Sequence, residues 1–169
     1  MSRIIRNAAV VADPWQVFSP EADSDLQTLP LPTGPQLLPL PVWQARREEI
    51  LARGEAFGLW LAPADDPAEI AADLGLFALI AVNFPKFADG RGYSTARLLR
   101  QRYGYQGELR AIGDVLHDQL HYLRRVGFDS FALKEGKDPA TALPGLTVFS
   151  EAYQTAVDQP EPLFRRRQA

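Results

Sequence analysis

Residues 77–133 read FALIAVNFPKFADGRGYSTARLLRQRYGYQGELRAIGDVLHDQLHYLRRVGFDSFAL, and this stretch decides the fold class. Three short runs rich in apolar residues are predicted strands: 77–84, 108–112 and 128–133. Two helical patterns separate them, Ser94–Tyr103 and a second one that Asp114 is expected to cap and Gly127 to end. Strands and helices that alternate at this spacing predict successive βα units, and therefore a parallel sheet.

The residues before this stretch extend the same pattern. FGLWLA, at 57–62, is a fourth predicted strand, and a helix that opens at Pro41 and ends at Gly54 precedes it. Asp66 and Pro67 suit the N-cap and first turn of another helix, which is expected to end near Gly75. We expect an α/β protein of about four successive βα units, with either a sequential half-barrel order or a flavodoxin-like order of strands.

The two ends of the chain differ from this core. Residues 14–41 hold seven of the 14 prolines and are expected to run extended across the surface, because proline disfavours helices and central strands. Upstream, Ile4–Ile5 and Ala8–Val11 predict an antiparallel β-ribbon. Asp138 and Pro139 predict a helix start, and a helix over about 145–157 is expected before the basic tail. We expect a single domain with three zones: 1–40 (ribbon and proline-rich arm), 41–137 (βα core) and 138–169 (C-terminal helix and tail).

Composition excludes several classes of function. The chain has 169 residues, no cysteine and a formal net charge of −3. The missing cysteines exclude disulfides, a thiol nucleophile and a cysteine-held iron–sulfur cluster, and they fit a cytoplasmic protein. No apolar run approaches the roughly 20 residues that span a bilayer. The near-neutral charge balance argues against nucleic acid as a partner, since a basic patch is the expected footprint of such binding.

The richest candidate site is FPKFADGRGYS, at 84–94. Strands of a parallel sheet end at one edge, where ligands bind, and this segment follows a predicted strand. Glycines beside cationic side chains at a helix start favour an anion, so phosphate, a sulfur oxyanion or a carboxylate is the expected ligand. The expected ligand-binding residues are Lys86, Gly90, Arg91, Gly92 and Ser94. The structural alternative is a turn that needs two glycines, because G-x-G lacks the full phosphate-loop fingerprint.

Asp114 and His117 are the candidate catalytic residues, because they follow the next strand at the same edge. His117 and His121 have an i,i+4 spacing, but no third ligand accompanies them, so no metal site is predicted. No cofactor is evident from the sequence, and a non-covalently bound flavin stays open.

The segments FADGRGYS, ARLLR, GYQGELRA, GDVL, DQL and GFDSF, all within residues 84–133, resemble an uncharacterised bacterial domain family. Its genes commonly lie beside that of the sirohaem sulfite reductase, and its members are sometimes described as oxidoreductases of sulfite reduction. The resemblance implies a role in the assimilation of sulfate to sulfide. It carries over no catalytic residues.

Three functions stay open. The first is an accessory protein of assimilatory sulfite reduction that docks to the reductase or its electron donor, or handles an anionic ligand. The second is a small enzyme or binding domain for a phosphate- or sulfur-oxyanion-bearing metabolite. The third is a structural partner protein without a ligand site, and a homodimer would cover its exposed sheet edges.

Overall fold

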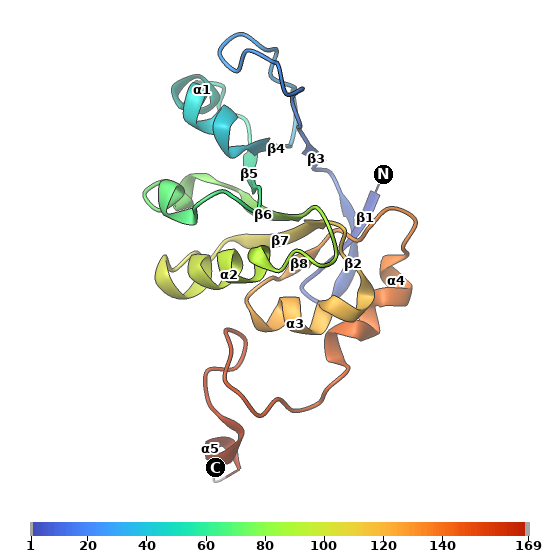
Figure 1. Ribbon diagram of the computed structural model, residues 1–169. Helices are drawn as coiled ribbons and strands as arrows, with labels where there is room; N and C mark the ends of the chain where they lie inside the picture. The colour runs from blue at the N-terminus through green and yellow to red at the C-terminus, as the bar shows by residue number, and fades with distance from the viewer. Residues whose placement is uncertain (1, 168–169) are drawn as a thin grey trace.

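The computed structural model describes residues 2–167, which form a curled half-barrel sheet with helices packed on it (Figure 1). The sheet has eight strands in the order β2-β1-β8-β7-β6-β5-β4-β3. Their bounds are β1 Ser2–Arg6, β2 Ala9–Asp13, β3 Gln16–Val17, β4 Gln36–Pro39, β5 Phe57–Leu61, β6 Leu79–Phe84, β7 Glu108–Gly113 and β8 Ser130–Phe131.

Strands β3 to β8 are parallel and lie side by side in chain order. The α/β parallel-sheet prediction is therefore confirmed in its half-barrel form, and the flavodoxin-like order is wrong. Because consecutive right-handed crossovers advance in one direction, their helices gather on one face of the sheet. The helices are α1 Leu40–Ala52, α2 Arg91–Arg97, α3 Leu120–Arg125, α4 Pro139–Ala142 and α5 Leu163–Arg166.

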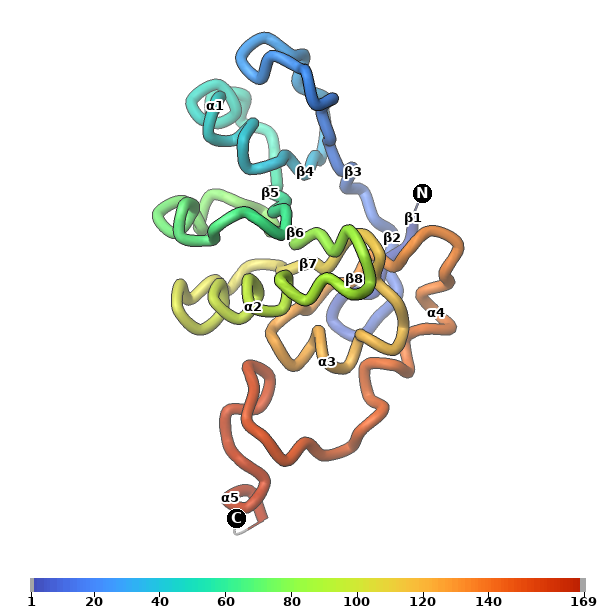
Figure 2. The backbone as a smooth tube through the Cα atoms, in the orientation of Figure 1, coloured from blue at the N-terminus to red at the C-terminus, as the bar shows by residue number. Residues whose placement is uncertain are grey.

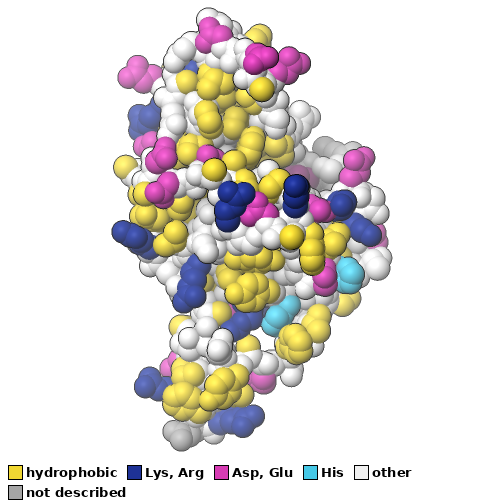
Figure 3. Space-filling view, viewed as in Figure 1, with side chains coloured by type: hydrophobic (Ala, Val, Ile, Leu, Met, Phe, Trp, Pro, Cys, Tyr) yellow, Lys and Arg dark blue, Asp and Glu magenta, His cyan; other side chains and the backbone are white. Residues whose placement is uncertain are grey.

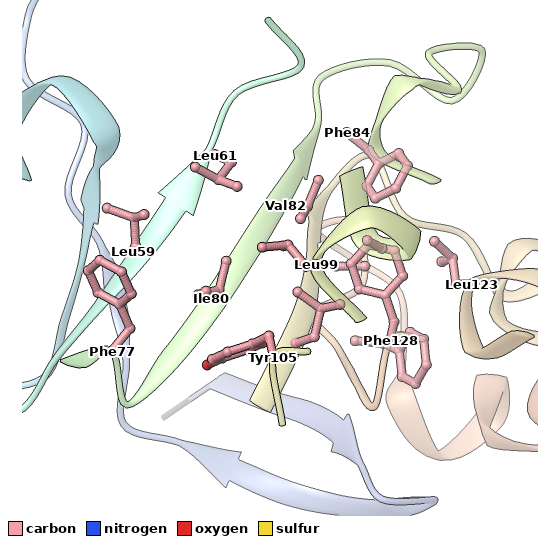
Figure 4. Close-up of a cluster of buried hydrophobic side chains, with 14 of the residues drawn as sticks. Leu59, Leu61, Phe77, Ile80, Val82, Phe84, Leu99, Tyr105, Leu123 and Phe128 are labelled. Carbon is pink, nitrogen blue, oxygen red and sulfur yellow. The ribbon is translucent and has the colours of Figure 1, made fainter. Parts of the chain in front are cut away.

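The main core lies between the sheet and these helices (Figure 4). Alternate residues of β6, Ile80, Val82 and Phe84, point into it and are at most 1% exposed. Leu99, in the π-helical turn Leu98–Arg102 that continues α2, and Leu123 of α3 pack against them from the helix side. The other face of the strand is buried too, at Leu79 and Ala81, which explains why residues 79–82 are an unbroken apolar run.

A smaller cluster on the opposite face of the sheet contains Leu37, Leu79, Ala81 and Ile112, with Trp15 and Trp60 packed against it. Only Pro14 and Trp15 separate the end of β2 from the start of β3, although these strands form the two edges of the sheet. Three peptide units span at most about 11 Å, so the sheet must curl until its edges approach there.

Arg110 of β7 links the edge strand β2 to the middle of the sheet. Its guanidinium is 1% exposed and lies 2.9 Å from Asp13 of β2 and 2.7 Å from Glu108. It also donates to the Ser130 hydroxyl at 3.2 Å. Asp13 and Arg110 are 97 residues apart, so this pair fixes the N-terminal strands across the curled sheet.

The predicted N-terminal ribbon is confirmed. β1 and β2 pair antiparallel, with Ile4 opposite Val11, and β1 also pairs antiparallel with β8. The ribbon therefore continues the sheet and is no separate appendage.

The proline-rich arm departs from expectation at 36–39. These residues form β4, between β3 and β5, and all four are buried. Proline is tolerated because Pro39 is the last residue of the strand, beyond the two positions at which β3 pairs with β4. The sequence predicted the helix from Pro41 to Gly54 without a strand before it. In the structure β4 precedes this helix, and the two form a fifth strand–helix unit.

Two predicted helices are wrong in form. The segment after Asp66 makes two short 3-10 turns, Pro67–Ile70 and Leu74–Leu76, although Asp66 does cap the first by accepting from the Ala68 amide. The helix expected over 145–157 is absent from the described residues, where a 3-10 turn ends at Thr147 and irregular chain follows. Asp138 caps α4 as predicted, through the Ala140 and Thr141 amides.

No helix within residues 2–167 is both long enough and apolar enough to cross a membrane.

Candidate functional site at the carboxyl edge of the sheet

The loops after β6, β7 and β8 meet at one edge of the sheet, and Asp114 joins them. The Asp114 amide donates to the Phe84 carbonyl at 2.7 Å, and its Oδ2 accepts from the Phe87 amide at 3.2 Å. Its Oδ1 is buried and makes an ion pair of 2.8 Å with the Lys134 ammonium, without hydrogen-bond geometry. Through its amide and its side chain, Asp114 therefore fixes three loops relative to one another.

The structure corrects the expected role of Asp114 as a helix cap. The helical segment begins later, at the 3-10 turn His117–Gln119, and Leu116 occupies its N-cap position. The Lys134 ammonium, followed by the Phe87 amide, holds the pKa of Asp114 below its ordinary value. Because a carboxyl that stays ionised cannot donate a proton near neutral pH, this geometry favours a structural role over general-acid catalysis.

Gly113 allows these loops to approach so closely. It has a φ of +95°, and a Cβ there would lie 2.5 Å from both the Asn83 Oδ1 and the Phe84 carbonyl oxygen. Any other residue would be strained and would separate the loops after β6 and β7.

The predicted anion-binding turn holds an ion pair of its own. Asp89 accepts from the Arg91 amide at 3.2 Å and from its guanidinium at 3.0 and 2.7 Å. The Arg91 contacts lower the pKa of the Asp89 carboxyl, and the same pair raises the pKa of Arg91. An incoming anion would therefore compete with a carboxylate for this guanidinium.

Gly92 has a structural explanation, because a Cβ there would lie 2.6 Å from the buried ring of Phe84. Gly90 faces no such contact, since a Cβ there would meet only Tyr93, at 3.9 Å.

Lys86 and Ser94 are exposed, and Lys86 forms no ion pair within residues 2–167. The assignment of Lys86, Gly90, Arg91, Gly92 and Ser94 as an anion site stays a prediction.

The two histidines have different surroundings. His121 Nδ1 lies 3.4 Å from the Leu146 carbonyl, and its ring centroid is 5.1 Å from that of Phe149. His117 is exposed and lines a cavity with residues that follow β8. Within residues 2–167, no three histidine, aspartate or glutamate side chains gather as a metal site requires.

A second surface lies on α3 and the segment after Thr147. It exposes large aromatic side chains, and we call it the C-terminal aromatic surface: Tyr122 (57% exposed), Phe149 (64%), Tyr153 (72%) and Phe164 (56%). Figure 3 shows apolar side chains across the lower part of the molecule, interspersed with cationic side chains, and α3 and the segment after Thr147 carry arginine but no lysine. No periodic pattern marks these aromatics in the sequence, and two of them, Phe149 and Tyr153, lie in the range 145–157 for which a helix is predicted.

Arginines fold the segment after Thr147 back toward the rest of the chain, which Figure 2 traces to the C-terminus. Arg125 of α3, which is 9% exposed, pairs with Asp158 at 3.4 Å and donates to the Gln154 carbonyl. Arg166 pairs with Glu151 at 2.7 Å within the segment itself. Polar contacts therefore position this segment, and its aromatics stay outside the core.

These features define an α/β protein with a curled, sequentially ordered half-barrel sheet. The chain belongs to a family described as "Bacterial protein of unknown function (DUF934)", whose model matches residues 58–164. No curated protein matches the sequence. The matched range begins within β5 and contains the carboxyl-edge loops after β6, β7 and β8 as well as all four residues of the C-terminal aromatic surface.

Proposed function

We propose that this protein is an accessory factor of assimilatory sulfite reduction that works by docking to a partner protein, either the reductase or its electron donor. The pathway rests on the resemblance carried by residues 84–133. The docking mode rests on one structural observation, which is the exposure of the C-terminal aromatic surface.

Exposed aromatic side chains of this size support docking because the contact of their rings with water is energetically unfavourable. A partner protein that covered the rings would remove that contact. Contiguous apolar patches on soluble proteins mark interaction sites, and tyrosine and phenylalanine are enriched at interfaces. By contrast, the charged candidates at the carboxyl edge are largely engaged, since Asp114 pairs with Lys134 and Arg91 pairs with Asp89.

The charge of this surface indicates the partner's chemistry. Arg165 lies over the Phe164 ring at 6.0 Å, and Arg97 near Tyr122 forms no ion pair within residues 2–167. Guanidinium groups beside aromatic rings suit a partner surface that carries carboxylates among apolar residues.

The test is growth of a strain that lacks the gene on sulfate, sulfite or sulfide as the sole sulfur source. We expect failure on sulfate and sulfite and rescue by sulfide. Normal growth on all three would refute the pathway.

Complementation of that strain then tests the surface. A Phe149→Ser, Tyr153→Ser, Phe164→Ser variant should fail to restore growth, although these exposed positions contribute little to stability. Phe87→Ser is the matched control, because Phe87 is 49% exposed but lies at the carboxyl edge. Full complementation by the triple variant would refute docking through this surface.

A further inference from the structure

We propose that the cavity between the loops after β7 and β8 binds a small organic anion, such as a carboxylate or sulfonate with a short apolar body. The cavity has a volume of about 240 Å³ and is lined by His117, Leu133, Lys137, Asp138, Thr141 and Ala142. It lies at the carboxyl edge, where parallel sheets bind ligands. This site is separate from the C-terminal aromatic surface and does not rest on the docking proposal.

The acidic group of the cavity is already neutralised. Asp138 Oδ1 accepts from the Arg3 guanidinium at 2.9 Å and from the Ala140 amide at 3.3 Å. Its Oδ2 accepts from the Thr141 amide and hydroxyl at 3.2 and 3.0 Å. Asp138 therefore has little capacity left for a cation, and its charge is balanced by Arg3.

The donors of the cavity are free. Within residues 2–167, neither the His117 ring nor the Lys137 ammonium makes a hydrogen bond or ion pair. An anionic head group would satisfy both, and hydrogen bonds to charged groups are among the stronger ones in proteins.

The loop that carries Lys137 is held at both ends. Lys134 pairs with Asp114 and donates its amide to the Val115 carbonyl at 2.9 Å, and Asp138 pairs with Arg3. The Lys137 amide closes the turn by donating to the Lys134 carbonyl at 3.1 Å. A fixed loop loses little conformational entropy on binding, which favours a small ligand.

The rest of the cavity wall favours a ligand with an apolar part. Leu133 and Ala142 provide apolar surface that would stay in contact with water if a bare inorganic anion were bound. The volume lies just below the range of about 300–1,000 Å³ typical of small-molecule pockets, so the ligand has only a few carbon atoms.

The test is titration of the isotope-labelled full chain with sodium butyrate, followed by two-dimensional NMR, with sodium chloride at equal ionic strength as the salt control. We expect saturable shifts of the amides of Lys137, Asp138 and Thr141 at millimolar butyrate. Acetate should bind several-fold more weakly, because it lacks two methylene groups.

Two matched variants locate the site. Lys137→Gln should weaken butyrate binding about tenfold or more, as loss of a charge-assisted hydrogen bond implies. Arg102→Gln should leave it unchanged, because Arg102 is an exposed cationic residue that does not line the cavity. Binding that Lys137→Gln leaves intact would overturn the proposal, as would an equal loss in Arg102→Gln, shifts that equal those with chloride or no shifts at all.

These outcomes are independent of the growth tests. Butyrate binding with normal growth of the deletion strain would retain the cavity and refute the sulfite pathway. The opposite pair of results would retain the pathway and refute the cavity.

Discussion

Aromatic side chains are buried in the sheet region and exposed in the segment after Thr147. Phe84, Phe128 and Phe131 of the sheet region are at most 2% exposed, whereas Phe149, Tyr153 and Phe164 are at least 56% exposed. Charges follow the same division, since Arg110 is buried between two carboxylates and Arg165 is exposed. The sheet region therefore accounts for stability, and the C-terminal segment offers side chains that folding does not use.

The largest effect should come from the buried charges of the sheet. Arg110→Met would leave Asp13 and Glu108 without their shared cation, and breaking a buried ion pair costs about 3–5 kcal/mol. We expect that loss in the free energy of unfolding, measured by urea denaturation. Arg6→Met is the control, because the exposed Arg6–Glu108 contact of 3.4 Å should contribute about 0–1 kcal/mol. Similar losses in both variants would contradict a special role for Arg110.

A smaller effect should come from the contact between α2 and β6. Gly92→Ala inserts a Cβ 2.6 Å from the Phe84 ring, which is held by Tyr93 and Phe128 at centroid distances of 5.3 and 5.9 Å. Overpacking of this kind costs about 1–3 kcal/mol. Gly90→Ala, two residues earlier, should change the free energy of unfolding by less than about 0.5 kcal/mol. Thermal unfolding of the two variants compares them directly, and equal melting temperatures would refute the close contact.

The carboxyl edge should show a pH-dependent effect. The lowered pKa of Asp114 means that its ionised form stabilises the fold above the ordinary aspartate pKa, and this contribution disappears as pH falls through the folded-state pKa. Wild type should thus be more stable than Asp114→Asn at neutral pH, and the difference should shrink on acidification below about pH 4. Denaturation at several pH values measures it. Glu135→Gln, on the loop that carries Lys134, is the control, and a constant gap for Asp114→Asn would contradict the ion pair.

The smallest effect should come from the C-terminal aromatics. Phe149→Ser should change the free energy of unfolding by less than about 0.5 kcal/mol, because Phe149 is 64% exposed. Phe128→Ala, at a 2% exposed position, should cost about 3–5 kcal/mol. Comparable losses from the two changes, measured by urea denaturation, would show that the C-terminal segment packs as tightly as the sheet.

Much of the fold follows from local sequence. The strands β5 to β8 lie within or close to the predicted runs, because apolar residues fill most of the buried positions of these strands. Asp66 and Asp138 act as predicted caps, since a cap bonds to amides only two or three residues away. β4 was missed because Pro39 normally argues against a strand, and only the short pairing of β3 makes it acceptable there.

The candidate site was less predictable. An aspartate before a helical pattern suits a cap or a loop contact equally well, and the partner that decides for Asp114 is Lys134, 20 residues later. The cavity depends on His117 from one loop and Lys137 from the next, and no local pattern joins them. The exposure of Phe149 and Tyr153 depends on irregular chain that follows Thr147, where the sequence predicted a helix over 145–157.

The sequence by itself determined the alternation of strands and helices, the parallel sheet and the edge at which chemistry would gather. Those features depend on side-chain periodicity and capping over a few residues. Only the tertiary structure decided which charges are neutralised, which donors stay free and which aromatics remain in water. Those properties depend on partners such as Asp13 and Arg110, which are distant in the chain and meet only when the sheet curls.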